Sequence, residues 1–218
     1  MKNVIFIAPP AAGKGTQSKL VSAEYNIPHI STGDLIRDEI ATGSDLGMEL
    51  KSVIDKGDLI SNDIIVSLLK KRLSQVDCNN GYILDGYPRN VSQAKIYNDL
   101  LKELSKEMGV VIFMDIDKSL ALNRTLSRLI CSSCGASFNT NVEELKPHVA
   151  GICDKCGGTL KVRSDDNKET FLNRFDTYLR ETKPLIDYYN ELGVLRTIKV
   201  GANESAQDIF NEIKNIID

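Results

Sequence analysis

Short apolar runs rich in β-branched residues alternate along the chain with segments of helical periodicity. The runs cover residues 4–7, 27–30, 82–84, 110–114 and 195–200. Such alternation predicts an α/β fold with a parallel sheet. The nearly continuous apolar character of the runs indicates strands that are covered by helices on both faces. We therefore expect a five-stranded parallel sheet, with a helix over Lys14–Tyr25 after the first strand.

Capping residues mark two further helix starts. Ser61 precedes the apolar positions Ile64, Ile65, Leu68 and Leu69, and Asp117 precedes Leu122, Leu126 and Leu129. Both cap types accept hydrogen bonds from the first turn of a helix, and the spacing predicts that both apolar faces belong to the core. Arg124 and Arg128 are four residues apart, so on one helix they share a face away from the leucines. From these two arginines alone, the simplest interpretation is a helix face that is exposed to solvent.

Residues 131–164 interrupt the pattern, with four cysteines, four glycines and no sustained periodicity. A helical pattern resumes after Asp166, which with Glu169 resembles a capping box. It continues through Phe171, Phe175, Tyr178 and Leu179. The cysteine segment is therefore predicted to be an insertion in the α/β core.

The cysteines of this insertion form two C-x2-C pairs, Cys131 with Cys134 and Cys153 with Cys156. The spacing is typical of a four-thiolate zinc site, in which each pair supplies two ligands of a tetrahedron. Two unrelated or redox-active pairs are the alternative. Because the protein supplies all four ligands, we expect zinc to be structural here and not catalytic. Cys78 stands apart and is most simply a buried thiol.

Net charge limits the class of partner. The formal charge is -3 with 26% charged residues, which argues against a general nucleic-acid binder. No stretch reaches the length of a membrane span, and the apolar N-terminal run is too short for a signal peptide. We therefore expect a reducing, cytoplasmic location, in which cysteines bind metals or stay free.

The segment APPAAGKGT, residues 8–16, follows the first apolar run and ends like a phosphate-binding loop. Gly13, Gly15 and the following helix N-terminus offer backbone N–H groups to phosphate, and Lys14 offers an ammonium group. The start of the loop is unusual, because Ala8 stands where such loops open on glycine.

Three further stretches strengthen the nucleotide interpretation: STGDLIR at 31–37, LDGYPRNVSQ at 84–93 and RSDDNKETFLNR at 163–174. Together with the loop, they resemble the adenylate kinase family over nearly the whole chain. The resemblance implies a three-layer P-loop fold with two mobile insertions. Residues 1–30, 61–126 and 167–218 would form the core, 31–60 the AMP-binding insertion and 127–166 a zinc-binding lid of the long bacterial type.

By position, the resemblance also implies a set of site residues. The ATP side would take Ala11, Ala12, Gly13, Lys14, Gly15, Thr16, Arg128, Ser137, Phe138 and, less directly, Glu204. The AMP side would take Thr32, Arg37, Asp58, Leu59, Ile60, Gly86, Tyr87, Pro88, Arg89, Gln93, Arg163 and Arg174. The transferring phosphates would be surrounded by Lys14, Arg89, Arg124, Arg128, Arg163 and Arg174, while Asp85 would hold Mg²⁺ through water.

The family's loop reads G-x-P-G-x-G-K-G-T, so this chain departs from it at Ala8 and Ala11. If either residue has a positive φ, alanine costs about 1–2 kcal/mol there. If both have negative φ, the only change is a methyl group near phosphate. Because Lys14 and the matched arginines are present, we expect a working loop.

The implied reaction is the Mg²⁺-dependent conversion of ATP and AMP to two ADP by a monomeric enzyme. A related kinase acting on UMP or CMP would use the same core, although Gln93 favours adenine in the resemblance. From another class, a zinc-ribbon module that binds nucleic acid with a vestigial loop is the alternative. The acidic net charge and the lack of aromatic residues among the basic ones count against it.

Overall fold

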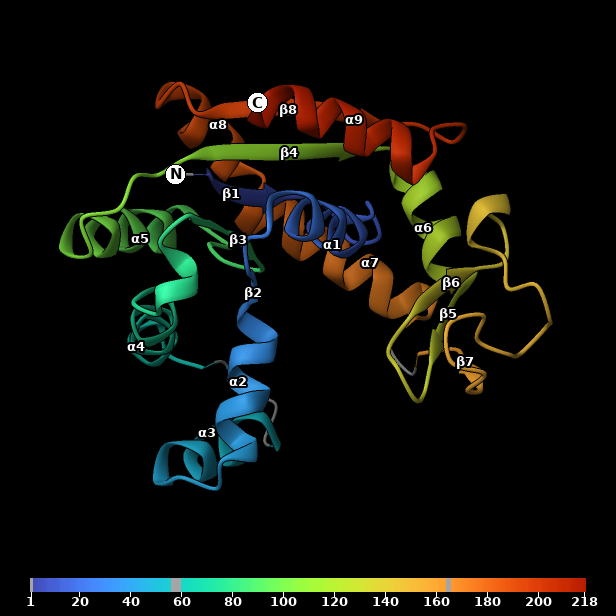
Figure 1. Cartoon of the computed structure of the whole chain (residues 1–218), viewed down its shortest axis with the longest axis horizontal. Helices are drawn as coiled ribbons and strands as arrows, with labels where there is room; N and C mark the ends of the chain where they lie inside the picture. Colours follow the sequence, from blue (N-terminus) through green and yellow to red (C-terminus); the bar gives the residue numbers. More distant parts are fainter. Residues whose placement is uncertain (1, 56–59, 164–165) are drawn as a thin grey trace.

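The computed structural model describes residues 2–55, 60–163 and 166–218. Its centre is the predicted five-stranded parallel sheet, in the order β2-β3-β1-β4-β8 (Figure 1). The strands are β1 (Lys2–Ile7), β2 (His29–Ser31), β3 (Gly81–Asp85), β4 (Val110–Ile116) and β8 (Leu195–Val200). The expected α/β fold and all five strand positions are therefore confirmed.

Alternating strand residues enter two separate cores, one on each face of the sheet. Ile5 and Leu84 pack with the helices α4 (Asn62–Leu73), α5 (Val91–Glu103) and α8 (Pro184–Glu191). Val4 and Ile83 pack on the other face with α1 (Lys14–Tyr25), α6 (Lys118–Leu126), α7 (Lys168–Thr177) and α9 (Ala206–Ile217). Both faces of each central strand are buried, which explains the continuous apolar runs in the sequence.

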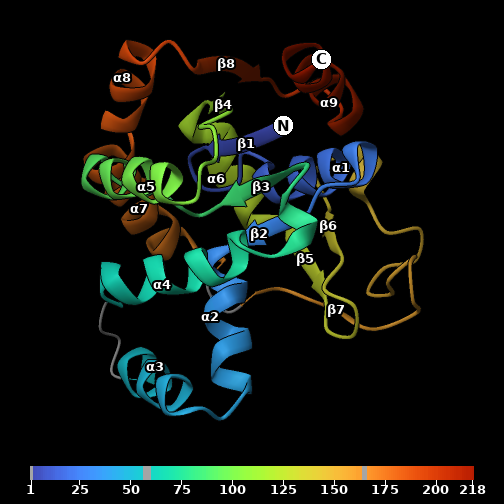
Figure 2. The same ribbon diagram turned by 60° about the vertical axis from the view of Figure 1, so that its left-hand side comes forward.

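Two parts project from this core in different directions (Figures 1 and 2). One comprises α2 (Thr32–Ala41) and α3 (Asp45–Asp55). The other carries a separate antiparallel sheet in the order β6-β5-β7, with β5 (Arg128–Cys131), β6 (Ser137–Asn139) and β7 (Leu160–Lys161). We call the part from β5 to β7 the lid.

The helix starts predicted from capping residues are present. The Ser61 side chain accepts from the backbone N–H of Ile64, and Asp117 accepts from those of Ser119 and Leu120. The predicted end of the second helix is wrong, because α6 stops at Leu126. Leu126 is 48% exposed, so it is not core.

Residues beyond α6 belong to the lid and not to a continued helix. Leu129 lies on β5 opposite Phe138 of β6, and Arg128 begins the same strand. Arg124 and Arg128 therefore do not share a helix face as predicted. The strand can form because β6 and β7 pair with β5 on its two edges.

The predicted capping box at the start of α7 is also wrong. Asn167 caps this helix, and its side chain accepts from the backbone N–H of Thr170. Asp166 instead turns inward to an ion pair with Arg128. After α7, the chain continues through a π-helical turn, Tyr178–Thr182, into α8. Tyr178 is buried, whereas Leu179 is 42% exposed and lies outside the core.

Candidate active site

A cleft of about 1680 Å³ lies next to the loop that joins β1 to α1. In parallel α/β sheets, ligands bind beyond the carboxyl ends of the strands, where the chain connections diverge. Here β1 lies between β3 and β4, and the loop after β1 is followed by the N-terminus of α1. The sheet therefore places the glycine-rich loop where an anion is favoured by backbone N–H groups and by the helix dipole.

The conformation of the loop answers the question raised by its two alanines. Ala11 has a φ of 62°, and Gly13, which caps α1, has a φ of 94°. Ala8 is not among the described non-glycine residues with positive φ. The loop therefore carries left-handed strain at Ala11, whereas at Ala8 alanine changes only the side-chain volume. Residues 11–16 all line the cleft.

Lys14 and Asp85 form an ion pair beside the loop, and His29 Nε2 lies 3.2 Å from the second carboxylate oxygen of Asp85. Asp85 ends β3, and His29 begins the neighbouring strand β2. Burial alone would raise the pKa of Asp85, but the hydrogen bond from His29 and the charge of Lys14 outweigh it and lower the pKa to about 2. Asp85 is therefore a carboxylate at neutral pH.

Arginines from several elements line the same cleft. They are Arg89 after β3, Arg124 on α6, Arg128 on β5, Arg163 after β7 and Arg174 on α7. Guanidinium groups bind phosphate oxygens bidentately, so such a convergence suits a polyphosphate ligand. The cleft thus collects cationic groups from both the core and the lid.

Arg124 lies in the last turn of α6, and its guanidinium group is partly buried. Its Nη2 donates to the carbonyl oxygen of Gly201 at 3.1 Å, whereas its buried Nε has no hydrogen-bond partner among the described residues. Burial lowers the pKa of Arg124, although the nearby charge of Glu204 opposes this. The Glu204 carboxylate in turn accepts from the backbone N–H of Gly201 at 2.6 Å. A buried donor without a partner suits a group that is reserved for a ligand.

Arg128 is held by a bidentate pair with Asp166, in which Nε lies 2.7 Å from Oδ2. The Asp166 side chain is 0% exposed and that of Arg128 is 22% exposed. Arg128 opens the lid and Asp166 follows it in the chain, so the pair joins the two ends of this insertion. It fixes the guanidinium at the edge of the cleft.

The lid also contributes Ser137 and Phe138 to the cleft lining. Ser137 is exposed, whereas Phe138 is 8% exposed and packs with Cys131, Ala136, Cys153 and Leu160 in a small lid core. The ring of Phe138 therefore stabilises the lid as well as bordering the cleft.

Several of the residues assigned to the AMP side are joined by hydrogen bonds around Gly86. Thr32 Oγ1 donates to the carbonyl oxygen of Gly86 at 3.2 Å, and Arg89 Nε donates to the same oxygen at 2.9 Å. Gly86 has a φ of 81°, and a Cβ there would lie 3.0 Å from Thr32 Oγ1, so only glycine fits without strain. The backbone N–H of Arg89 donates to Gln93 Oε1 at 2.8 Å.

Other AMP-side residues lie away from this group. Arg37 is exposed and pairs with Asp34 on α2, outside the cleft lining. Asp58 and Leu59 lie outside the described residues, and Ile60 directly precedes the cap Ser61. Tyr87 is buried, and its hydroxyl donates to the carbonyl oxygen of Gln93, while Pro88 borders the cleft.

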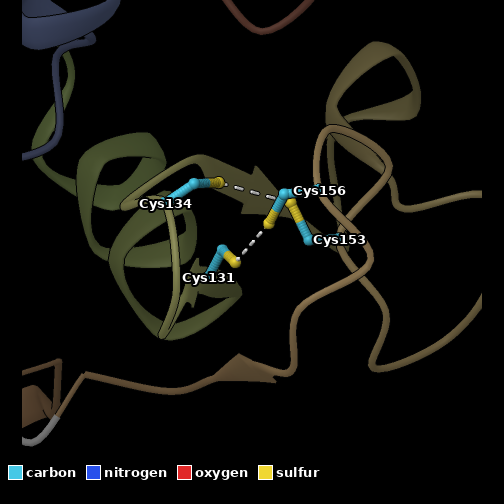
Figure 3. Close-up of side chains that lie close together, drawn as sticks. All are labelled: Cys131, Cys134, Cys153 and Cys156. Carbon is cyan, nitrogen blue, oxygen red and sulfur yellow. Dashed lines mark hydrogen bonds between the residues drawn. The ribbon is translucent and has the colours of Figure 1, made fainter.

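The four lid cysteines converge as the C-x2-C spacing predicts (Figure 3). Their sulfur atoms all lie within 4.8 Å of one another, with Cys131 and Cys156 3.5 Å apart and Cys134 and Cys153 3.7 Å apart. Zn–S bonds of about 2.3 Å place the sulfurs of a tetrahedron about 3.8 Å apart, so the cluster fits zinc.

The surroundings favour a thiolate at Cys131, whereas at Cys156 the backbone N–H of Gly158 lowers the pKa, but hydrogen bonds with the neighbouring cysteine sulfurs outweigh it and raise the pKa to about 12. Backbone N–H groups, first that of Cys134, lower the pKa of Cys131 to about 6. A Cβ on Gly158 would lie 2.9 Å from the Cys131 sulfur and 2.5 Å from Ser133 Oγ, so the second pair can approach the first only with glycine there. Cys78 is fully buried in the core, as predicted.

Three contacts of the site were not predicted from the sequence. His29 lies against Asp85, Asp166 binds Arg128, and Asn62 Oδ1 accepts from Gln93 Nε2 at 2.9 Å. Each joins residues that are far apart in the sequence. The strand sequence PHIS, residues 28–31, does not by itself indicate which distant residue His29 contacts.

Comparison with known proteins agrees with this geometry. The family model for adenylate kinase matches residues 6–194. Proteins named adenylate kinase from Clostridium tetani and Bacillus mycoides are 41% and 43% identical to the chain over 215 residues. Each comparison covers 99% of this chain and 98% of the relative. No described helix is long and apolar enough to cross a membrane. With a phosphate-binding loop, a ring of arginines and this similarity over its length, the chain belongs to the adenylate kinase family.

Proposed function

We propose that the protein catalyses the reversible Mg²⁺-dependent transfer of the γ-phosphoryl group of ATP to AMP, which gives two ADP. The observation that carries this proposal is the convergence of the loop around Lys14 and five arginines on one cleft. The adenylate kinase names of the relatives support the identity of the substrates.

The chemistry requires position and charge more than a nucleophilic side chain. An oxygen of the AMP phosphate forms a bond to the γ-phosphorus, and the bond from that phosphorus to the β,γ-bridging oxygen breaks. The attacking phosphate is already an anion, so no general base is needed. Arg89, Arg124 and Arg128 are suited to holding both anions in line and to stabilising the charge of the transition state.

Lys14 and the backbone of the loop would bind the ATP phosphates. The ammonium group of Lys14 now pairs with Asp85, and we propose that it moves to the β- and γ-phosphates when ATP binds. Gly13 and the N-terminus of α1 would supply backbone N–H groups. The lid residues Ser137 and Phe138 would border the adenine of ATP.

The AMP site would form around Gly86, Arg89 and Gln93. The hydrogen bonds that join Thr32, Gly86 and Arg89 support a preorganised site for this nucleotide. Arg37 lies on the projecting α2, so its participation requires α2 to move toward the cleft. Arg163 and Arg174 would complete the binding of the AMP phosphate.

Asp85 fits the role of a Mg²⁺-organising residue, because it borders the loop and is ionised at neutral pH. When bound with ATP, Mg²⁺ would neutralise part of the charge of the phosphates. We propose zinc as the ion of the four lid cysteines, with a structural role, since all four ligands come from the protein. We further expect a cytoplasmic monomer, for which sedimentation of the purified protein tests the oligomeric state.

A substrate panel tests the proposed function. The purified protein is mixed with ATP, Mg²⁺ and either AMP, UMP, CMP or GMP, and ADP formation is followed. We expect rapid ADP formation with AMP and much slower formation with the other three. Preference for UMP or CMP would instead identify a pyrimidine kinase, and no turnover with any acceptor would contradict the proposed function.

A further inference from the structure

Gln93 is anchored through both ends of its side-chain amide. Its Oε1 accepts from the backbone N–H of Arg89 at 2.8 Å, and its Nε2 donates to Asn62 Oδ1 at 2.9 Å. Its backbone is anchored as well, since its N–H donates to the Asn90 side chain at 3.0 Å and its carbonyl oxygen accepts from Tyr87. Both side chains of the Gln93–Asn62 pair are partly buried.

These contacts define which end of the amide is oxygen. A backbone N–H can only donate, so the Gln93 atom that faces Arg89 must be the acceptor Oε1. The Nε2 group therefore faces α4, where Asn62 meets it with its carbonyl oxygen. A flipped Gln93 amide would place two donors against each other at Arg89, and it could keep a bond to Asn62 only if the Asn62 amide turned as well.

The orientation matters for the recognition of a base. Adenine presents an amine donor at N6 beside an acceptor at N1, whereas hypoxanthine and guanine present an acceptor at O6 beside a donor at N1. An amide with fixed oxygen and nitrogen positions can match one of these edges and opposes the other. Each Gln93 amide atom retains capacity for one more hydrogen bond after its bond to the protein.

We propose that Asn62 is a positioning residue for base specificity, which holds the Gln93 amide in the orientation that matches adenine. This inference rests on the proposed function, in which Gln93 contacts the adenine of AMP. Asn62 is well placed for such a role, because it is the first residue of α4 and its contact joins α4 to the first turn of α5. Asn62 itself acts through Gln93.

The test compares AMP with IMP as acceptors in four proteins: the unaltered chain, Asn62→Ala, Asn62→Asp and Asp63→Ala. The Asp variant retains an oxygen acceptor for Gln93. Asp63 is an exposed residue in the same helical turn, so its variant controls for changes at the start of α4. Both acceptors carry the same ribose phosphate, so the ratio of their kcat/KM values isolates the base.

We expect Asn62→Ala to raise KM for AMP by roughly three- to tenfold, the loss expected for one neutral hydrogen bond, with little change in kcat. The ratio of kcat/KM for AMP to that for IMP should fall by a similar factor. Asn62→Asp should restore the ratio, and Asp63→Ala should leave it unchanged.

An unchanged AMP to IMP ratio in Asn62→Ala would overturn the inference, provided that the unaltered chain converts AMP to ADP. If the unaltered chain fails to use AMP, the proposed function fails instead, so the two failures are distinguishable. Partial misfolding of a variant does not obscure the result, because both acceptors are measured on the same preparation and the folded fraction cancels in the ratio.

Discussion

Ala11 shows how a single residue can carry strain inside a binding loop. Its φ of 62° lies in the left-handed region, which costs alanine about 1–2 kcal/mol and glycine little. Ala11→Gly should therefore raise the free energy of unfolding by about 0.5–1 kcal/mol, after the larger chain entropy of unfolded glycine is subtracted. The apparent affinity for ATP should improve or stay unchanged.

Thermal unfolding of Ala11→Gly and Ala8→Gly checks this expectation. For a chain of this size, 1 kcal/mol corresponds to about 2–4 °C in Tm. Ala8 lacks the positive φ, so its replacement by glycine should lower Tm. A lower Tm or a clear loss of ATP affinity in Ala11→Gly would show that the alanine is favourable in this loop.

A second prediction at the residue scale concerns Lys14 and Arg89. Each places a positive group in the cleft, so Lys14→Ala and Arg89→Ala should each reduce turnover by about 10²- to 10³-fold. Arg89 gives the cleaner test, since Lys14 also neutralises the partly buried carboxylate of Asp85 and its loss can affect stability.

The control for these variants is Arg196→Ala, an exposed arginine on β8 that is not among the residues lining the cleft. It should retain both turnover and Tm. Near-normal turnover by Arg89→Ala, measured as ADP formation at saturating substrates, would contradict the assignment of Arg89 to the transferring phosphates.

At the scale of elements, the Arg128–Asp166 pair joins the beginning of the lid to the chain segment that follows it. Removal of Asp166 leaves a partly buried guanidinium without this bidentate partner. We expect Asp166→Ala to lower the free energy of unfolding by about 2–3 kcal/mol and to reduce turnover, because Arg128 loses its fixed position.

A matched comparison is Glu181→Ala, which breaks the exposed contact between Glu181 and Arg180. Exposed pairs contribute about 0–1 kcal/mol, so this variant should unfold nearly normally. Urea unfolding of both variants measures the difference. If Asp166→Ala is as stable and as active as Glu181→Ala, the pair neither stabilises the lid nor positions Arg128.

The elements that the sequence predicts well are those whose signal is local. The central strands β1, β3 and β4 are buried on both faces over most of their length, so each contains a nearly continuous apolar run. The edge strands β2 and β8 also lie at predicted positions, although β8 exposes Arg196, Thr197 and Lys199, and the helix Lys14–Tyr25 has the predicted bounds. The clustering of the four cysteines could be predicted from their spacing alone, because each C-x2-C pair presents two thiol groups from one tight turn.

The errors arise where long-range pairing decides the structure. Leu126 and Leu129 fit a helical repeat, yet Leu129 lies on β5 because β6 and β7 supply partners for this strand. Asp166 resembles a cap, but the charge of Arg128 offers a stronger interaction than a backbone N–H. Likewise, the strain at Ala11 depends on a φ that composition does not encode.

For the molecule as a whole, the lid is a small unit with two separate anchors. Five buried residues, two of them cysteines of the cluster, make up its core. Such a core is too small to order the lid alone, so we expect cross-linking of the two cysteine pairs by the proposed metal to be the main source of order at the outer end. The Arg128–Asp166 pair holds the other end, next to the cleft.

These two anchors predict how loss of the metal affects stability and activity. Cys153→Ser removes one ligand, so the variant should bind less zinc and unfold at a lower temperature. It should still form ADP in the cold, because Lys14, Arg89, Arg124 and Arg174 lie outside the lid and Arg128 retains Asp166.

Cys78→Ala is the control: this cysteine is buried in the core, so its loss should reduce stability without loss of zinc. Metal analysis, thermal unfolding and ADP formation in the cold are measured on both variants. Stoichiometric zinc in Cys153→Ser, or complete loss of transfer while the variant remains folded, would contradict a purely structural metal that orders the lid from its outer end.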